Sequence, residues 1–337
     1  MYQISQLFST TPMTKLPLGV YYMRHGSRSR APEYTAEGVP VASFREKLES
    51  KPFLVTAEMT PPKGVNIEHN LSLLDSLAAV DAVNVTDQNA SVMRLGPLPL
   101  GKVILDQGIE PICQFTCRDR NRIALQSDLL GAHVLGIHNI LCLTGDPTGT
   151  GDHPDAKPVF DLSVIDLLRA AAGLESGVDM ADNPLDGAPT FCLGAAANPG
   201  APDVDVEVGR MEQKVNAGVR FFQTQAVYEP DQFARFMDAA RGLNVPILAG
   251  ILVLHSGRMA RYLNANLPGI VVPQSLINEM DAAENKREKG IEIAARIISG
   301  VAGLTRGVHL MPMGWERDVP RLMRLSGLTS AEDAGPA

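Results

Sequence analysis

Short apolar runs alternate with longer amphipathic segments through most of the chain. The apolar runs have the length and composition of strands and lie at residues 53–58, 82–86, 111–116, 140–145, 190–196, 219–225, 246–252 and 307–313. The segments between them carry apolar residues at helical spacing, and several end at a glycine suited to a helix C-terminus, such as Gly218 and Gly242. This alternation is typical of repeated strand-helix units that build a parallel sheet.

The number of units predicts how the sheet closes. A helix-like segment separates each strand from the next, and an α/β fold with a single closed (β/α)8 TIM barrel accounts for this better than an open doubly wound sheet. We expect the catalytic barrel over residues 51–325, an N-terminal extension over 1–50 and a flexible C-terminal tail over 326–337. The extension has no sustained periodicity and carries a basic, serine-rich patch at 24–34, so we expect it to pack on the barrel or on a neighbouring subunit.

Composition limits the classes of protein that the chain can belong to. Of its 337 residues, 45% are apolar and 20% charged, which is typical of a globular protein with a sizeable core. The net charge of -8 without a basic stripe predicts no nucleic-acid partner. No apolar run is long enough to cross a membrane, and the N-terminus lacks the pattern of a secretory signal. We therefore expect a cytoplasmic protein.

Several motifs that would indicate other chemistry are incomplete. Residues 96–102 have the spacing of a phosphate-binding loop, but Val103 replaces the required hydroxyl residue and two prolines remove N–H donors. Residues 149–154 lack the last glycine of a dinucleotide fingerprint, and the seven histidines show no metal-ligand spacing, so we predict no metal. Buried, reduced packing residues are expected at Cys113, Cys117, Cys142 and Cys192.

Polar side chains stand at the ends of the predicted strands. The carboxyl ends of all barrel strands meet at one rim, where TIM-barrel enzymes place their active sites. A single polar residue there is more often a loop cap, but a set around one rim favours a ligand pocket. The set comprises Glu58, Thr86, Asp87, Gln114, Thr116, Asp146, Asn198 and Gln225.

Segments on consecutive predicted strands resemble the methylenetetrahydrofolate reductase family. The resemblance is carried by VTAEMTPPKG at 55–64, VNVTDQ at 83–88, QFTCRD at 114–119, LCLTGDP at 141–147, MEQKVNAG at 211–218, FFQTQ at 221–225 and GIL at 250–252. It covers roughly residues 50 to 315. It implies a flavoprotein oxidoreductase of one-carbon metabolism and methionine biosynthesis that reduces 5,10-methylenetetrahydrofolate to 5-methyltetrahydrofolate, with FAD as cofactor and NADH as electron donor.

The resemblance also implies residue roles. Glu58 matches the general acid that protonates N10, so that the imidazolidine ring of the substrate opens to an iminium cation. Asp146 matches the aspartate beside the flavin and the pterin, where its charge tunes hydride donation. Gln225 matches a hydrogen-bond partner of the pterin. Flavin contacts are implied for Thr86, Gln114, Asn198 and Lys214.

Three segments depart from the family pattern. Residues 250–259 lack the proline and the stacking aromatic common in members that use NADH, which leaves the electron donor open between NADH, NADPH and a protein. Residues 195–205 lack the aromatic and histidine that often flank the flavin, so backbone groups around Asn198 would have to serve. The single tryptophan, Trp315, lies at the rim as either a lid or a half-buried packing residue.

Two other functions remain compatible with the sequence. A pterin-binding methyltransferase barrel would use a similar rim without a flavin. A folate reductase subunit could instead take electrons from a protein partner, docked on the rim and the extension. A homo-oligomer is also compatible with the sequence.

Overall fold

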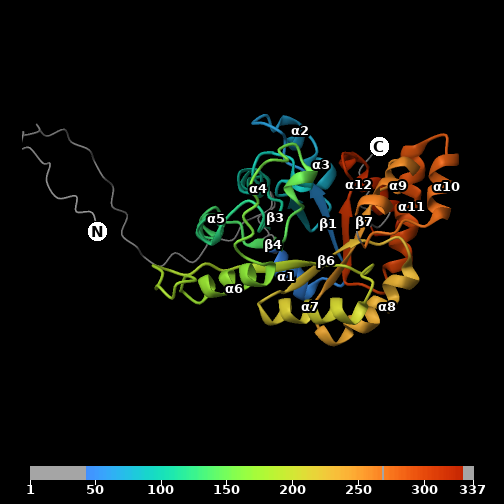
Figure 1. The fold of residues 1–337 in the computed structure, drawn as a ribbon. Coiled ribbons are helices and arrows are strands. Elements are labelled where there is room, and N and C mark those ends of the chain that lie inside the picture. Colours follow the sequence, from blue (N-terminus) through green and yellow to red (C-terminus); the bar gives the residue numbers. More distant parts are fainter. Residues whose placement is uncertain (1–42, 268, 329–337) are drawn as a thin grey trace, which may run out of the picture. The chain divides into compact units, whose positions relative to one another are not determined.

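The computed structural model describes residues 43–267 and 269–328, and all eight expected strands form there (Figure 1). Every neighbouring pair is parallel, the strands follow one another in chain order, and β8 pairs with β1 to close the barrel. The predicted TIM barrel is therefore confirmed. The strands are β1 (Leu54–Met59), β2 (Ala82–Val85), β3 (Pro111–Thr116), β4 (Asn139–Leu143), β5 (Cys192–Ala197), β6 (Phe221–Ala226), β7 (Ile247–Leu252) and β8 (Gly307–Met311).

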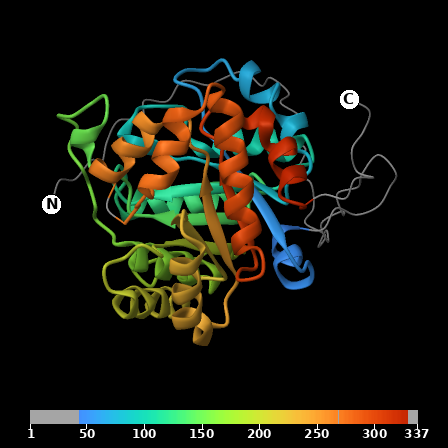
Figure 2. The same cartoon turned by 90° about the vertical axis from the view of Figure 1, so that its right-hand side faces the viewer.

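Helices surround the barrel and cover the outer faces of the strands. Figure 2 shows the side on which α9, α10, α11 and α12 lie. The helices that follow β1 to β8 are α2 (Glu68–Leu71), α3 (Leu74–Leu77), α4 (Pro97–Asp106), α5 (Arg122–Val134), α6 (Val164–Glu175), α7 (Val204–Asn216), α8 (Pro230–Ala240), α9 (Gly257–Asn266), α10 (Gln274–Ala282), α11 (Lys286–Val301) and α12 (Val319–Leu325).

The helix layer differs from the sequence pattern in three places. The single helix expected after β1 is divided into α2 and α3, and at the division the Ser72 hydroxyl donates to the carbonyl of His69. Such a local side-chain bond competes with continuous helix. α9 and α10 form within the long connection before α11, and α12 follows the last strand; the sequence pattern predicted none of these three helices.

Side chains at alternate strand positions fill the barrel interior in layers. The lowest layer is an apolar cluster of Leu54, Ala82, Ile112, Leu141, Cys192, Phe221 and Leu248. Two positions further along the strands, the interior becomes polar, with Thr56, Asn84, Gln223 and His309 joined by hydrogen bonds. Two positions further again, Glu58, Thr86 and Gln225 stand at the mouth. The interior thus changes from apolar to polar toward the C-terminal rim.

A short helix, α1 (Phe44–Ser50), closes the floor of the barrel. Ser43 and Glu46 cap its first turn reciprocally. Phe44 is fully buried and meets Phe221 edge to face, with ring centroids 5.3 Å apart. A Cβ at position 194 would lie 2.3 Å from the Phe221 ring, so only glycine leaves room for it. α1 falls within the predicted extension; residues 1–42 and 329–337 lie outside the described residues.

Removal of the Phe44 ring should destabilise the whole barrel. We expect Phe44→Ala to lower the free energy of unfolding by about 3–5 kcal/mol, because the truncation leaves a cavity between α1 and Phe221. Urea denaturation measures the difference. Val65→Ala, at a side chain that is 91% exposed, is the control and should stay within about 0.5 kcal/mol of the wild type. Equal effects of the two substitutions would show that α1 does not support the barrel.

Candidate active site

Glu58 enters the barrel mouth from the end of β1. Its side chain is 17% exposed, so it is sheltered but accessible to a ligand. The buried Gln114 of β3 donates from Nε2 to Glu58 Oε2 across 3.4 Å, and His309 Nε2 of β8 lies 3.8 Å from the same oxygen. The structure therefore brings together two residues selected from the sequence, Glu58 and Gln114, and adds His309.

A buried polar chain continues below this carboxylate. His309 Nδ1 lies 3.0 Å from Thr56 Oγ1, and Gln223 Nε2 donates to that hydroxyl at 3.0 Å. Gln223 and Asn84 exchange two amide hydrogen bonds of 2.7 and 3.0 Å. All four side chains are buried, and the chain pairs them with one another. Polar residues at alternate positions of apolar strands are the sequence signal that could have identified these four hydrogen-bonded side chains.

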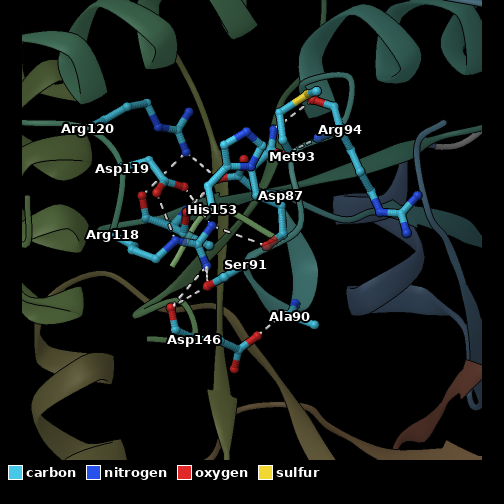
Figure 3. A network of polar contacts seen from close by, with 12 residues as sticks. Asp87, Ala90, Ser91, Met93, Arg94, Arg118, Asp119, Arg120, Asp146 and His153 are labelled. Carbon is cyan, nitrogen blue, oxygen red and sulfur yellow. Dashed lines mark hydrogen bonds and ion pairs between the residues drawn. The ribbon is translucent and has the colours of Figure 1, made fainter. Parts of the chain in front are cut away.

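Asp146, in the loop after β4, is exposed and lies in a network of loop contacts (Figure 3). Its Oδ2 accepts from the backbone N–H of Ala90 at 2.9 Å, and its carbonyl accepts from Ser91 Oγ and Arg118 Nη1 at 2.9 and 3.1 Å. Arg118 is almost fully buried and also donates to the carbonyl of Gln88. The loops after β2, β3 and β4 are thereby joined around one guanidinium group.

The charge on Arg118 is stabilised locally. Burial opposes the charged form, but the paired Asp119 and the nearby carboxylates of Asp87 and Asp146 raise the pKa of Arg118 above its usual value. The loop after β2 also has φ values of 49° at Gln88 and 54° at Ala90, a left-handed conformation that non-glycine residues adopt only where surroundings enforce it. The Arg118 and Asp146 contacts supply that constraint.

Asp87 and Thr116, both noted from the sequence as rim residues, face one another inside the protein. Asp87 Oδ2 accepts from the N–H and the hydroxyl of Thr116 at 2.8 and 2.9 Å, and it pairs with Arg120. Burial raises the pKa of the Asp87 carboxyl, whereas Arg120 and the Thr116 donors oppose that rise. These residues join β2 to β3 and its following loop.

The other residues predicted to contact a ligand differ in their burial and in their hydrogen-bond partners. Thr86 is buried and its hydroxyl donates to Asn89 Oδ1 at 3.4 Å, while the half-buried Asn198 accepts from the Gly200 N–H. Lys214 on α7 reaches Ala196 of β5, where Nζ donates to the carbonyl at 2.7 Å. Burial lowers the pKa of the Lys214 ammonium. Lys214 is thus not a freely solvated surface lysine.

Gln225 is exposed at the end of β6. The register between β6 and β7 shifts between Gln223 and Ala226, and such irregularities redirect side chains near functional sites. Thr224 spans the irregularity: its hydroxyl accepts from the Gly250 N–H at 2.9 Å and donates to the Gln225 carbonyl at 2.8 Å. The amide of Gln225 offers a donor and an acceptor to a ligand in the mouth.

Trp315 packs beside the exits of β7 and β8. Its ring stacks on His255 with centroids 3.7 Å apart, and the Arg287 guanidinium carbon lies 5.6 Å from the indole centroid. His255 in turn contacts the Pro312 carbonyl through Nε2. The structure therefore shows Trp315 as a half-buried packing residue, one of the two alternatives left by the sequence.

Several polar groups near the C-terminal ends of the strands could hold a cofactor that has hydrogen-bonding edges. Lys214 retains two N–H donors beyond the one given to Ala196, and Asn198, Gln114 and Thr86 add amides and a hydroxyl. No group of at least three His, Cys, Asp or Glu side chains within the described residues is arranged to hold a metal ion. Across the same residues, no helix is long and apolar enough to span a membrane.

A cavity of about 530 Å³ lies at the opposite end of the barrel. Its lining comes from α8, the turn after it and the start of β7, together with residues that precede β8, and includes Asp238, Arg241 and Arg306. This cavity lies by the N-terminal ends of β7 and β8, whereas Glu58 and Asp146 lie near the C-terminal ends of β1 and β4. We therefore place the candidate active site at the C-terminal mouth, in keeping with the general behaviour of this fold.

The fold and the mouth define a (β/α)8 barrel with an acid and amide groups at its C-terminal end. Residues 43–327 match the family model of methylenetetrahydrofolate reductase, and the chain belongs to this family. The resemblance seen in the sequence is thus confirmed.

Named relatives agree with this membership, and a solved structure shares the fold. Methylenetetrahydrofolate reductase 2 of Schizosaccharomyces pombe is 30% identical over 68% of this chain, which spans 38% of that protein. The 5,10-methylenetetrahydrofolate reductase of Escherichia coli is 25% identical over 72% of this chain and 78% of its own length. A Clostridium thermocellum protein, described as binding two copies of 5-methyl-5,6,7,8-tetrahydrofolic acid, shares the fold with a TM-score of 0.61 at 16% identity, covering 85% of this chain and all of that one.

The burial of His255 should make stability depend on pH. Burial lowers the pKa of folded His255 below 6.5, so the unfolded chain takes up its proton at higher pH than the folded protein. The free energy of unfolding should therefore fall as the pH drops below about 6.5, until the folded histidine is also protonated. Denaturation curves at several pH values, followed by the fluorescence of Trp315, measure this slope.

Two variants test the assignment of the slope. His255→Gln should lose part of the pH dependence, whereas His69→Gln, at an exposed position of α2, should retain the wild-type slope. An unchanged slope in His255→Gln would show that other groups cause it.

Proposed function

We propose that this protein reduces 5,10-methylenetetrahydrofolate to 5-methyltetrahydrofolate, with FAD as its cofactor and Glu58 as the general acid. The observation that carries the proposal is the position of Glu58 at the end of β1, sheltered in the mouth and contacted on one oxygen by Gln114. Family membership over residues 43–327 supports the reaction, and a folate ligand is consistent with the name of the Clostridium protein of the same fold.

The reaction needs a proton donor before it needs a hydride. The five-membered ring of the substrate opens when N10 leaves, and a protonated leaving nitrogen departs more easily. A carboxylic acid in a sheltered site can supply that proton, and general acids of this kind contribute about 10²- to 10⁴-fold to a rate. Glu58 Oε2 is occupied by Gln114, so the second oxygen is left to face a ligand in the mouth.

Asp146 and Gln225 would orient and stabilise the substrate. The ring opening leaves a cationic iminium, and the exposed Asp146 carboxylate, held by Ala90 and the Arg118 network, would stabilise that charge electrostatically. Gln225 would bind the pterin through its amide. FAD, when bound, would supply the hydride; Thr86, Gln114, Asn198 and Lys214 are the residues that would hold it.

The electron donor and the surroundings of the protein belong to the same proposal. Residues 250–259 hold no Phe, Tyr or Trp in place of the missing ring, and His255 within them already stacks on Trp315. We expect poor use of NADPH and either modest use of NADH or dependence on a protein donor. A cytoplasmic location fits such a reductase.

The purified protein should bind FAD through Lys214. Lys214→Met should weaken FAD binding by about 10-fold or more, because it removes a charged hydrogen-bond donor. Titration of the apoprotein with FAD, followed by fluorescence, measures this affinity. Lys157→Met, at an exposed position, is the matched control. Protein that stays colourless with FAD present and transfers methyl groups would support the methyltransferase alternative instead.

Glu58→Gln should separate the two half-reactions. The amide has nearly the shape of the acid but cannot protonate N10, so reduction of the folate should fall by about 10²- to 10⁴-fold. Reduction of the flavin by its electron donor involves no ring opening and should stay within a small factor of the wild type. Rapid mixing under anaerobic conditions records each half-reaction by flavin absorbance.

Asp146→Asn is the comparison for this test. It removes a charge without removing the proton donor, so it should slow the folate step and also shift the reduction potential of the flavin. If Glu58→Gln slows both half-reactions equally, or leaves the folate step unchanged, Glu58 is not the acid.

A further inference from the structure

The hydrogen bonds beneath Glu58 have a direction, and that direction determines where His309 carries its proton. Gln223 Nε2 donates to Thr56 Oγ1 at 3.0 Å, which leaves the hydroxyl hydrogen of Thr56 to be donated to His309 Nδ1, also 3.0 Å away. If Nδ1 carried the hydrogen instead, the hydroxyl would accept twice and its own hydrogen would have no acceptor in a fully buried place.

The direction depends on the orientation of two amides at the far end of this hydrogen-bond chain. Asn84 Nδ2 donates to Gln223 Oε1 at 2.7 Å, and Gln223 Nε2 donates back to Asn84 Oδ1 at 3.0 Å. This reciprocal pair turns the second hydrogen of the Gln223 amide toward Thr56. Turning both amides over would reverse every bond from Asn84 to His309. The orientation of one buried amide pair thus controls the tautomer of a histidine two strands away.

We propose that Asn84, Gln223 and Thr56 hold His309 as a neutral imidazole with its hydrogen on Nε2, directed at Oε2 of Glu58. His309 Nε2 lies 3.8 Å from that oxygen, and such contacts commonly shorten when a ligand binds. His309 does not meet the substrate; it is a positioning residue.

The consequence concerns the two oxygens of the acid. Gln114 Nε2 donates to Oε2 at 3.4 Å, so two N–H groups, from β3 and β8, face the same oxygen. When both groups donate to Oε2, the acidic hydrogen is favoured on Oε1, the oxygen that remains for the substrate. The inference about Oε1 rests on the proposed function, whereas the tautomer of His309 does not.

The tautomer can be measured without any turnover. Two-bond ¹H–¹⁵N NMR spectra of the full, ¹⁵N-labelled protein distinguish a neutral imidazole protonated at Nε2 from one protonated at Nδ1. The seven histidines give separate patterns, and His309 is identified by the pattern that His309→Gln removes. We expect Nε2–H for His309. An Nδ1–H tautomer, or a doubly protonated ring, would overturn the proposal.

A matched pair of substitutions tests the effect on Glu58. Thr56→Val has the same shape but removes the bridging hydroxyl, and Thr56→Ser restores it. We expect Thr56→Val to lose the single tautomer and to lower kcat of the folate step by about 10- to 100-fold, as for other residues that orient a reacting group. KM for the folate should stay near the wild-type value, because Thr56 does not reach the mouth. Thr56→Ser should recover both the tautomer and most of the rate.

The outcomes separate this inference from the proposed function. Equal rates for Thr56→Val and Thr56→Ser, beside a normal loss of activity in Glu58→Gln, would overturn the positioning role and leave the function intact. An active Glu58→Gln protein would overturn the function, while an Nε2–H signal would still support the chain from Asn84 to His309. If Thr56→Val does not fold, the wild-type spectrum decides the tautomer by itself.

Discussion

The closed interior of the barrel constrains everything else in this structure. Every second residue of each strand points into a space that holds little water, so a polar side chain placed there must find its partner on another strand. The lowest layer meets this constraint by being apolar and is closed by Phe44. The middle layer meets it by pairing polar groups with one another. In the top layer Gln225 is exposed to solvent, while the buried Thr86 donates to Asn89. This gradient leaves Glu58 sheltered without sealing it from a ligand.

The loops of the mouth obey a second constraint, which is the burial of a guanidinium. Arg118 loses its hydration in the folded protein, and the carbonyls of Gln88 and Asp146 together with Asp119 replace the lost water. Because these partners come from three different loops, the charge cannot be satisfied unless all three take one arrangement. The desolvated arginine therefore fixes the conformation of the loop that carries Asp146. Its burial selects one arrangement of the loops and adds little to the free energy of unfolding.

The sequence predicts the strands well and the supporting contacts poorly, for physical reasons. Buried parallel strands are short apolar runs, so their ends were predicted to within two residues. The division of α2 from α3 coincides with a hydrogen bond from the Ser72 hydroxyl to the His69 carbonyl, which the apolar pattern does not reveal, and α1 is too short to show a period. Glu58 and Gln114 were found because each is a polar residue near the C-terminal end of an apolar strand, but 118–120 reads as three equivalent charged residues. Only the approach of the loops decides that Arg118 is the buried one.

The two acidic groups of the mouth are supported in different ways, and the difference matches what each would do. Proton transfer needs a hydrogen bond of about 2.6–3.2 Å along a defined direction, so its donor benefits from a rigid strand and from neighbours that select one oxygen. Electrostatic stabilisation falls only with the inverse of distance, so a carboxylate on a loop serves if its charge stays in place. Glu58 stands on β1 above a directed hydrogen-bond chain, and Asp146 stands on a loop held by a buried cation. A purely apolar middle layer would satisfy the barrel equally well but would leave the direction of the Glu58 carboxyl unspecified.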